Sequence, residues 1–186
     1  MRITESESKI LILLAAKSVA EKIDPGFIFS GTIPDLSGNL CNRCGAFVSV
    51  YVDGELRGCI GTFSEEEPLY VNVVNMAVSA ATEDSRFSSI QADELSRLEL
   101  EISILTPRQR IFDPSEIIIG KHGIYLKHGL NRGTLLPQVA VKQDWTPLEF
   151  LGNCARYKAG IGWDGWKQAE IYTYEAMVFR SEIPWL

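Results

Sequence analysis

The sequence lacks a hydrophobic run long enough to cross a membrane. Its longest strongly apolar stretch is residues 10–16, whereas a membrane-spanning helix needs about 20 such residues. It also lacks a basic leader with a cleavage-site pattern, so we expect an untargeted, cytoplasmic chain. No long Lys/Arg run occurs, and 18 basic against 24 acidic residues give a net charge of −6. This sign disfavours wholesale neutralisation of a nucleic-acid backbone.

Cysteine is scarce, and the common catalytic signatures are missing. Cys41 and Cys44 have C-x-x-C spacing, but this pair supplies only two of the four ligands that structural zinc needs. We interpret both as surface thiols that are able to oxidise. No P-loop, dinucleotide fingerprint, H-E-x-x-H or G-x-S-x-G is present. The sequence therefore predicts neither a metal site nor a cofactor.

The 186 residues, 46% of them hydrophobic, suit one globular domain or one domain with a small appended lobe. Capping signals followed by apolar residues at helical spacing predict helices over residues 4–23, 64–81 and 146–158. The second of these begins at a capping box of Ser64 and Glu67. Its apolar residues lie on most sides, which is typical of a buried helix.

Alternating and β-branched segments predict the strands, and turn-rich segments predict the loops. The expected strands are residues 46–52, 55–61, 98–104, 117–119, 124–127, 133–136 and 169–179. Residues 25–44 are rich in Gly, Pro, Ser and Asn, and predict an extended surface loop. Strands and helices interleave irregularly, without a βαβ repeat. This favours an α+β fold with a mainly antiparallel or mixed sheet flanked by helices.

Residues 56–61 read Leu-Arg-Gly-Cys-Ile-Gly, and strand alternation places Arg57, Cys59 and Gly61 on one face. A guanidinium near a thiol favours the thiolate, which is the nucleophilic and metal-binding form. Gly58 and Gly61 remove side-chain bulk, so a ligand or another backbone can approach closely. One interpretation of this strand is therefore an activated cysteine in a cleft.

The expected hairpin register supports the other interpretation. Pairing across the predicted two-residue turn places Val50 opposite Arg57 and Val48 opposite Cys59. That neighbourhood is partly apolar, and free cysteine is among the most buried residue types. The strand alone therefore leaves open whether Cys59 is reactive or simply buried.

Other residue types that carry chemistry are dispersed along the chain. His122, in a Gly-Lys-His-Gly segment, is expected in an exposed tight turn, where it either transfers protons near neutral pH or is merely solvated. His128 is expected at a solvated hairpin tip. Cys154 shares a helical stripe with Phe150 and Tyr157, which predicts a buried, inert thiol.

Three further polar signals are weak. Glu99 and Glu101 share a strand face, which solvated alternation explains without catalysis. Asp84 and Arg86 follow the second predicted helix and either line a pocket mouth or form a polar loop. Gln138 lies near the start of a short helix.

The segment at residues 56–61 resembles the signature of the AMMECR domain family, and other segments resemble that family in the same order. They are residues 45–50, 68–70, 80–81, 84–87, 98–105, 120–123, 135–140 and 171–179. The resemblance covers roughly residues 8–180. Ordered agreement over that length is far more specific than any one motif.

The resemblance implies a single AMMECR-type domain over residues 1–186, with a larger and a smaller subdomain around a cleft. The chain looks like the compact prokaryotic form, the protein A type of the AmmeMemoRadiSam system. Prokaryotic members are often partnered with a dioxygenase-like Memo-type protein and a radical-SAM protein, which makes these the implied partners. Nucleic-acid-related and enzymatic roles have both been proposed for members, and the resemblance supplies no established reaction.

The first functional hypothesis is a small enzyme or enzyme component. Cys59 would be its nucleophile or a ligand, Arg57 would favour the thiolate or hold an anionic substrate, and His122 would transfer protons. The residues expected to bind substrate are Gly58, Gly61, Arg86 and Gln138.

The second hypothesis is a non-catalytic module that binds or scaffolds a partner protein or nucleic acid. A continuous positive stripe around Arg43, Arg57 and Arg86 would favour nucleic acid despite the net charge. A third hypothesis is redox sensing by Cys41 and Cys44.

Overall fold

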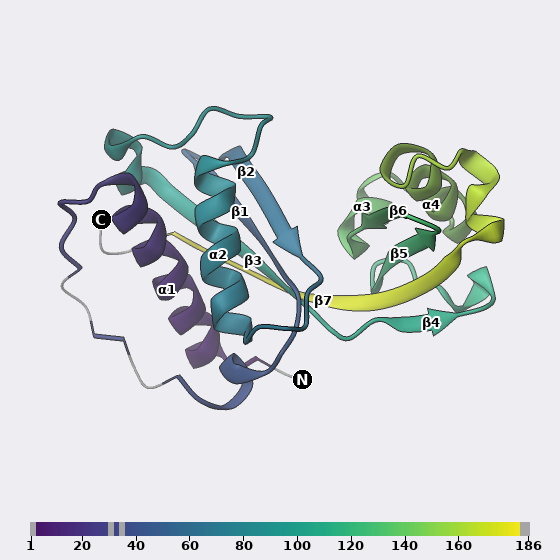
Figure 1. The fold of residues 1–186 in the computed structure, drawn as a ribbon, viewed down its shortest axis with the longest axis horizontal. Helices are drawn as coiled ribbons and strands as arrows, with labels where there is room; N and C mark the ends of the chain where they lie inside the picture. The colour runs from purple at the N-terminus through teal and green to yellow at the C-terminus, as the bar shows by residue number, and fades with distance from the viewer. Residues whose placement is uncertain (1–2, 30–31, 34–35, 183–186) are drawn as a thin grey trace. The chain divides into compact units, whose positions relative to one another are not determined.

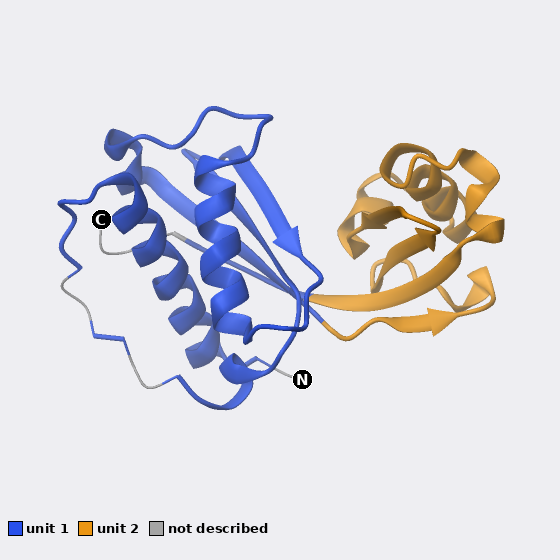
Figure 2. Ribbon diagram, viewed as in Figure 1, with its two compact units in different colours: residues 1–105, 177–186 blue, residues 106–176 orange. Residues whose placement is uncertain are grey.

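The computed structural model describes residues 3–29, 32–33 and 36–182. Residues 30–31 and 34–35 of the expected long loop therefore lie outside the described residues. The chain forms two compact units (Figure 2). Unit 1 comprises residues 1–105 and 177–186, and unit 2 comprises residues 106–176.

Unit 1 combines two long helices with a sheet (Figure 1). Its elements are α1 (Glu5–Ile23), η1 (Gly38–Cys41), β1 (Ala46–Val52), β2 (Glu55–Thr62), α2 (Leu69–Thr82), η2 (Ala92–Arg97) and β3 (Leu98–Leu105). The last strand of the chain, β7 (Glu170–Glu182), begins in unit 2 and ends in unit 1, where it lies next to β3.

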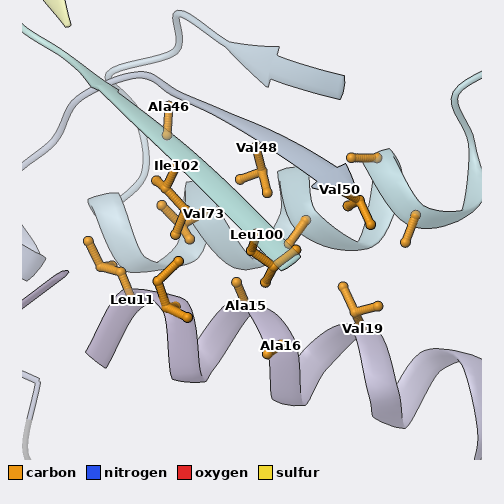
Figure 3. Close-up of a cluster of buried hydrophobic side chains, with 14 of the residues drawn as sticks. Leu11, Ala15, Ala16, Val19, Ala46, Val48, Val50, Val73, Leu100 and Ile102 are labelled. Atoms are coloured by element: carbon orange, nitrogen blue, oxygen red, sulfur yellow. The ribbon is translucent and has the colours of Figure 1, made fainter. Parts of the chain in front are cut away.

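The core of unit 1 lies between its helices and one face of its sheet. In β1 the buried positions alternate, and Val48 and Val50 are fully buried beside Leu100 of β3. Leu11 and Val19 of α1 are equally buried against this layer (Figure 3). The strand period of two and the helical spacing of apolar residues thus meet in one core.

Unit 2 is smaller and has its own core. Its elements are β4 (Gln109–Ile111), η3 (Pro114–Glu116), β5 (His122–His128), β6 (Asn131–Leu135), α3 (Pro137–Lys142), α4 (Pro147–Asn153), the π-helical turn η4 (Cys154–Lys158) and η5 (Trp163–Gln168). Ile124 and Leu126 of β5 pack with Phe150 and Leu151 of α4. The opposite face of this sheet carries polar and aromatic side chains.

The sheet order confirms the expected fold class. The strands run β2-β1-β3-β7-β5-β6, with β4 paired to β7. The pairings of β1 with β2 and β3, and of β7 with β4 and β5, are antiparallel, as is that of β5 with β6. Helices flank this sheet, so the fold is α+β. The two units confirm the two expected subdomains, while a cleft between them stays a prediction. No helix in the described part of the chain is both long and apolar enough for a membrane span.

Two of the expected elements are wrong. The capping box at Ser64 does not form, because α2 begins only at Leu69, after an extended Pro68. The backbone there pairs elsewhere: the N–H of Leu69 donates to the carbonyl of Asn42, at 2.8 Å. No strand forms at residues 117–119, because Ile117 closes the 3₁₀ turn that Asp113 caps. Tertiary contacts and local turn chemistry therefore override the segment patterns.

Candidate functional site

The register of the β1–β2 hairpin decides the surroundings of Cys59. A β-bulge in β2 shifts the pairs by one residue, so Val50 lies opposite Gly58 and Ser49 lies opposite Cys59. The predicted register, which placed a valine opposite Cys59, is wrong. The apolar neighbour that favoured a buried thiol is therefore absent, and Cys59 is half-buried.

The thiol lies on the sheet face that the helices of unit 1 do not cover. Ser49 pairs with Cys59 on one side and with Glu101 on the other, so these three side chains form one row across β2, β1 and β3. The positions alternate with the core residues Val48 and Ile102, which face the helices. A thiol, a hydroxyl and a carboxylate are thus aligned on one polar face.

The next row of this face is held by an arginine. The Arg180 guanidinium lies 3.8 Å from the centroid of the Tyr51 ring and forms an ion pair of 2.7 Å with Glu99. Burial raises the pKa of the Tyr51 hydroxyl, and the negative charge of Glu101 raises it further. Tyr51 and Glu99 therefore form the row beside that of Cys59, Ser49 and Glu101 on the same face.

Asp84 and Arg86 hold the backbone of Cys59 from the open side of β2. The Asp84 carboxylate accepts the backbone N–H of Cys59 at 2.8 Å, and the Arg86 guanidinium donates to the Cys59 carbonyl oxygen at 3.0 Å. The same guanidinium donates to both Asp84 oxygens, at 2.6 and 2.9 Å. Because β2 is the last strand in the sheet order, this pair takes the place of a further strand at Cys59.

The two charges of this pair differ in exposure. The Asp84 side chain is 6% exposed and the Arg86 side chain is 59% exposed. The hydrogen bonds from Arg86 hold the pKa of Asp84 well below its usual range, although burial opposes this. The Asp84 hydrogen bond raises the pKa of Arg86. Asp84 therefore anchors the pair, while Arg86 presents a permanent cation to solvent.

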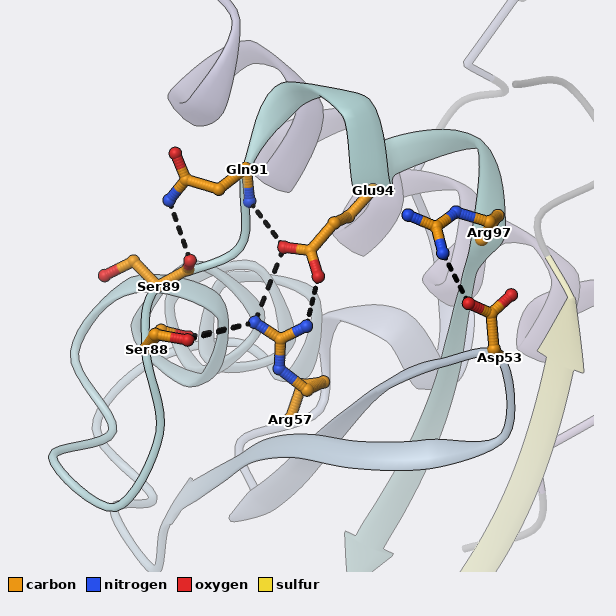
Figure 4. A network of polar contacts seen from close by, with 7 residues as sticks. All are labelled: Asp53, Arg57, Ser88, Ser89, Gln91, Glu94 and Arg97. Carbon is orange, nitrogen blue, oxygen red and sulfur yellow. Dashed lines mark hydrogen bonds and ion pairs between the residues drawn. The ribbon is translucent and has the colours of Figure 1, made fainter.

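Arg57 faces different partners. Its guanidinium forms an ion pair with Glu94 of η2 and donates to the Ser88 hydroxyl at 3.3 Å (Figure 4). The Glu94 carboxylate also accepts the backbone N–H of Gln91, at 2.9 Å. Arg57 thus ties the loop between α2 and β3 to the edge of the sheet. Its expected action on the Cys59 thiol stays a prediction.

The two glycines of the signature lie against the chain itself. A Cβ at Gly58 would lie 1.9 Å from the carbonyl oxygen of Ala80, so this position allows α2 to approach β2 closely. A Cβ at Gly61 would overlap the Phe47 ring. Both glycines therefore have a packing role, and their assignment to substrate binding stays a prediction.

His122 and Gln138 belong to unit 2, apart from the other predicted site residues. His122 is the first residue of β5 and is half-buried rather than exposed in a turn. Its Nδ1 accepts the backbone N–H of Ile118 at 3.2 Å, so the neutral ring carries its proton on Nε2. Gln138 is half-buried in α3. That His122 meets Cys59 in one site stays a prediction.

The remaining cysteines are poor candidates for catalysis. Burial raises the pKa of Cys44 to about 11 and that of Cys154 to about 12. Cys154 is thus buried, as expected, whereas the expectation of a surface thiol at Cys44 is wrong. Cys41 is exposed, and its thiol donates to the carbonyl of Leu36 at 3.5 Å. Tyr157, expected in the same stripe as Cys154, is 66% exposed.

These burials predict a sharp division among the thiols. In the native protein at pH 8 we expect Cys44 and Cys154 to react with a disulfide reagent at least about 100-fold more slowly than Cys41, because neither thiolate forms nor is accessible. Mass mapping after timed labelling measures this, with the protein in urea as the control. Equal labelling of Cys41 and Cys44 in the native protein would contradict it.

Within the described residues, no group of three or more His, Cys, Asp or Glu side chains is placed to hold a metal ion.

The comparisons with known proteins agree with this fold and this signature. The profile of the AMMECR1 family matches residues 12–179. The chain belongs to the AMMECR1 family. Protein MK0488 of Methanopyrus kandleri is 37% identical over 194 aligned positions, which cover 98% of the chain and 92% of that protein. A protein of Methanosarcina acetivorans is 36% identical, and the alignment covers 98% of this chain and 95% of that protein.

A solved structure resembles the whole chain. The crystal structure of the uncharacterised protein PH0010 from Pyrococcus horikoshii has a TM-score of 0.86 and 30% identity, and the match covers 99% of this chain and 96% of that one. This chain and PH0010 therefore share the same fold. The names of these relatives do not state a reaction.

Sequence reasoning missed part of this AMMECR1 site. Ser49, Tyr51 and Arg180 lie on the same face as Glu101, and Asp84 holds the Cys59 backbone. The alternation of Ser49 and Tyr51 with buried valines was a usable signal for the face. Asp84 offered only its spacing from Arg86, because no local pattern shows which strand a loop carboxylate will contact.

Proposed function

We propose that this AMMECR1 chain is an enzyme, or the reactive component of one, in which Cys59 is the nucleophile and Arg86 binds a negatively charged group of the substrate. The observation that carries the proposal is the Asp84–Arg86 pair. It fixes both backbone groups of Cys59, and it leaves the Arg86 side chain 59% exposed, with its guanidinium 3.0 Å from the Cys59 carbonyl oxygen. A positioned cation both attracts an anionic substrate and favours a thiolate.

The chemical step is a nucleophilic substitution. The thiol gives its proton to solvent, and the thiolate sulfur forms a bond to an electrophilic carbon of the substrate. The electron pair of the broken bond leaves with the departing group, which takes up one proton. His122, whose neutral ring carries a proton on Nε2, is the residue that the sequence predicts for this last transfer.

Three features support Cys59 over the other thiols. It is half-buried on a sheet face that carries the polar side chains of Ser49 and Glu101, whereas Cys44 and Cys154 are buried. Its backbone is fixed on both sides, which gives the sulfur a defined position. Cys41 is exposed at the end of a 3₁₀ turn, and its thiol donates to the carbonyl oxygen of Leu36.

The test compares two alkylating reagents of similar size on a Cys41→Ser background. We expect Cys59 to react with iodoacetate faster than its exposure alone predicts, and Arg86→Lys or Arg86→Ala to lower the iodoacetate-to-iodoacetamide rate ratio about fivefold, because the anion loses its guanidinium. Arg57→Ala is the matched control, since Arg57 is paired with Glu94, and it should leave the ratio unchanged.

A Cys59 that reacts with neither reagent while the protein is folded would remove the nucleophile. The non-catalytic binding module would then be the remaining function for this face. In that case Cys59→Ser should retain activity in cells. The partners that the resemblance implies, a Memo-type and a radical-SAM protein, stay a prediction under either outcome.

A further inference from the structure

Charge is divided unequally between the two units. Residues 106–176 contain nine Lys/Arg and seven Asp/Glu, a net of +2, whereas the whole chain has 18 and 24, a net of −6. The other residues therefore carry nine basic and 17 acidic side chains, a net of −8. A basic region within an acidic chain indicates a surface for an anionic partner.

Four of the nine basic residues of unit 2, which are Arg108, Arg110, Lys127 and Arg132, lie on or beside one face of its sheet. Arg110, Tyr172, Tyr125 and Thr134 form one row across β4, β7, β5 and β6. Glu170, Lys127 and Arg132 form the adjoining row across β7, β5 and β6. The residues between them, such as Ile124 and Leu126, point to the opposite face and into the core. We call the face formed by these two rows, together with Arg108, the basic aromatic face.

The contacts on this face join cations to aromatic rings. The Arg108 guanidinium lies 4.6 Å from the Tyr125 ring centroid, and the Tyr125 and Tyr172 centroids lie 6.1 Å apart at 67°. Lys127 and Arg110 share one carboxylate, that of Glu170, at 3.5 and 3.8 Å.

The cations of this face are accessible. The side chains of Arg110 and Lys127 are 51% and 42% exposed, and Arg108 and Arg132 are exposed as well. Arg110 and Lys127 share the single carboxylate of Glu170, which leaves an excess of positive charge beside the Tyr172 ring, whose hydroxyl donates to the same carboxylate. In unit 1, Arg57 of the expected positive stripe is paired with Glu94, while Arg86 is hydrogen-bonded to Asp84 and keeps an exposed side chain.

We propose that the basic aromatic face binds single-stranded nucleic acid. Its cations suit the regularly spaced phosphates of such a chain, and the tyrosine rings and the Arg108 plane suit unpaired bases, which expose a π-face for stacking. A duplex hides those faces in its own stack, and a broad sheet face does not enter a groove as a helix does. The residues of this face belong to unit 2 and Cys59 belongs to unit 1, so the inference does not depend on the proposed enzyme.

The experiment measures binding of fluorescein-labelled 15-nucleotide oligo(U) and oligo(dT) to the full chain by anisotropy, from about 50 to 300 mM salt. We expect both single strands to bind, a matched duplex to bind at least about fivefold more weakly, and affinity to fall steeply with salt. Tighter binding of oligo(U) would identify RNA as the ligand, and tighter binding of oligo(dT) would identify DNA. Inorganic polyphosphate serves as the competitor that carries charge but no bases.

Variants separate charge from stacking. Arg110→Ala with Lys127→Ala should weaken binding about tenfold and flatten the salt dependence, whereas Glu170→Gln should strengthen it. Tyr125→Leu should weaken binding about tenfold, and Tyr125→Phe, which keeps the ring, should restore it. Arg156→Ala is the matched control, because Arg156 forms the same kind of pair with Tyr157 but lies in η4.

Two outcomes would overturn the inference. One is the absence of single-strand binding at 50 mM salt by wild-type protein whose fold is intact. The other is binding that Tyr125→Leu leaves unchanged and that the duplex and polyphosphate compete for equally, which would show attraction to polyanions in general. An equal loss in Arg156→Ala would likewise argue against this face.

Discussion

Replacing Gly58 with alanine is expected to destabilise the protein by about 4 kcal/mol or more, an amount comparable to the whole stability of many domains. The added Cβ would lie 1.9 Å from the backbone carbonyl oxygen of Ala80. A backbone atom within α2 cannot rotate away, so the helix and β2 must separate, and Val73 and Ala77 would lose their packing on the sheet. Urea denaturation, or the soluble yield if the variant does not fold, measures the effect.

Gly61→Ala is the matched control within the same strand. Its Cβ would lie 2.1 Å from Cγ of Phe47, so the whole ring has to change its rotamer, but a side chain can be displaced more easily than the α2 backbone. We therefore expect a loss of about 2–3 kcal/mol, smaller than that of Gly58→Ala. A Gly58→Ala protein as stable as wild type would show that α2 does not approach β2 as closely as described.

The sequence was a good guide to elements whose signals are local. The Thr4 capping box begins α1, and the Thr146 capping box begins α4, as expected. The alternation in residues 98–105 gives β3 with one face in the core. In each case a hydrogen bond or a buried side chain only a few residues away enforces the conformation, so a short window contains the cause.

The sequence was a poor guide where a conformation depends on residues that are distant along the chain. The bulge in β2 occurs where Gly58 packs against α2 and the Cys59 N–H donates to Asp84. The sequence of the hairpin alone does not predict this bulge. The carboxylate that holds Cys59 is 25 residues away in the chain. Arg57 was the natural candidate because it is near in sequence, yet the arginine whose guanidinium hydrogen-bonds to the Cys59 backbone is Arg86. Spacing along the chain identifies reactive residue types but not their partners.

Replacing Asp84 with asparagine is expected to cost about 3 kcal/mol at pH 7. The carboxylate is nearly buried and accepts hydrogen bonds from the Cys59 N–H and from the Arg86 guanidinium. An amide keeps the shape but loses the charge, and its nitrogen faces donors. Asp53→Asn is the control, because the Asp53–Arg97 ion pair is exposed and should contribute less than about 1 kcal/mol.

The pH dependence of stability shows whether Asp84 acts through its negative charge or only through its packing. The folded pKa of Asp84 is lowered, so its contribution is complete above the unfolded pKa of about 3.9 and is lost as pH falls through the folded value. At pH 3 the unfolded chain already binds most of the proton, while the native carboxylate does not. The difference in stability between wild type and Asp84→Asn should therefore shrink by about 1 kcal/mol from pH 7 to pH 3.

Other carboxylates with lowered pKa values, such as Glu94 and Glu7, lose their contributions over the same range. They are present in both proteins, so their effects cancel in the difference, and only the titration of Asp84 remains. If the difference in stability between wild type and Asp84→Asn stayed constant from pH 7 to pH 3, Asp84 would not be an ionised carboxylate paired with Arg86 in the folded protein. The fixed position of the Cys59 backbone, on which the proposed chemistry depends, would then lack its cause.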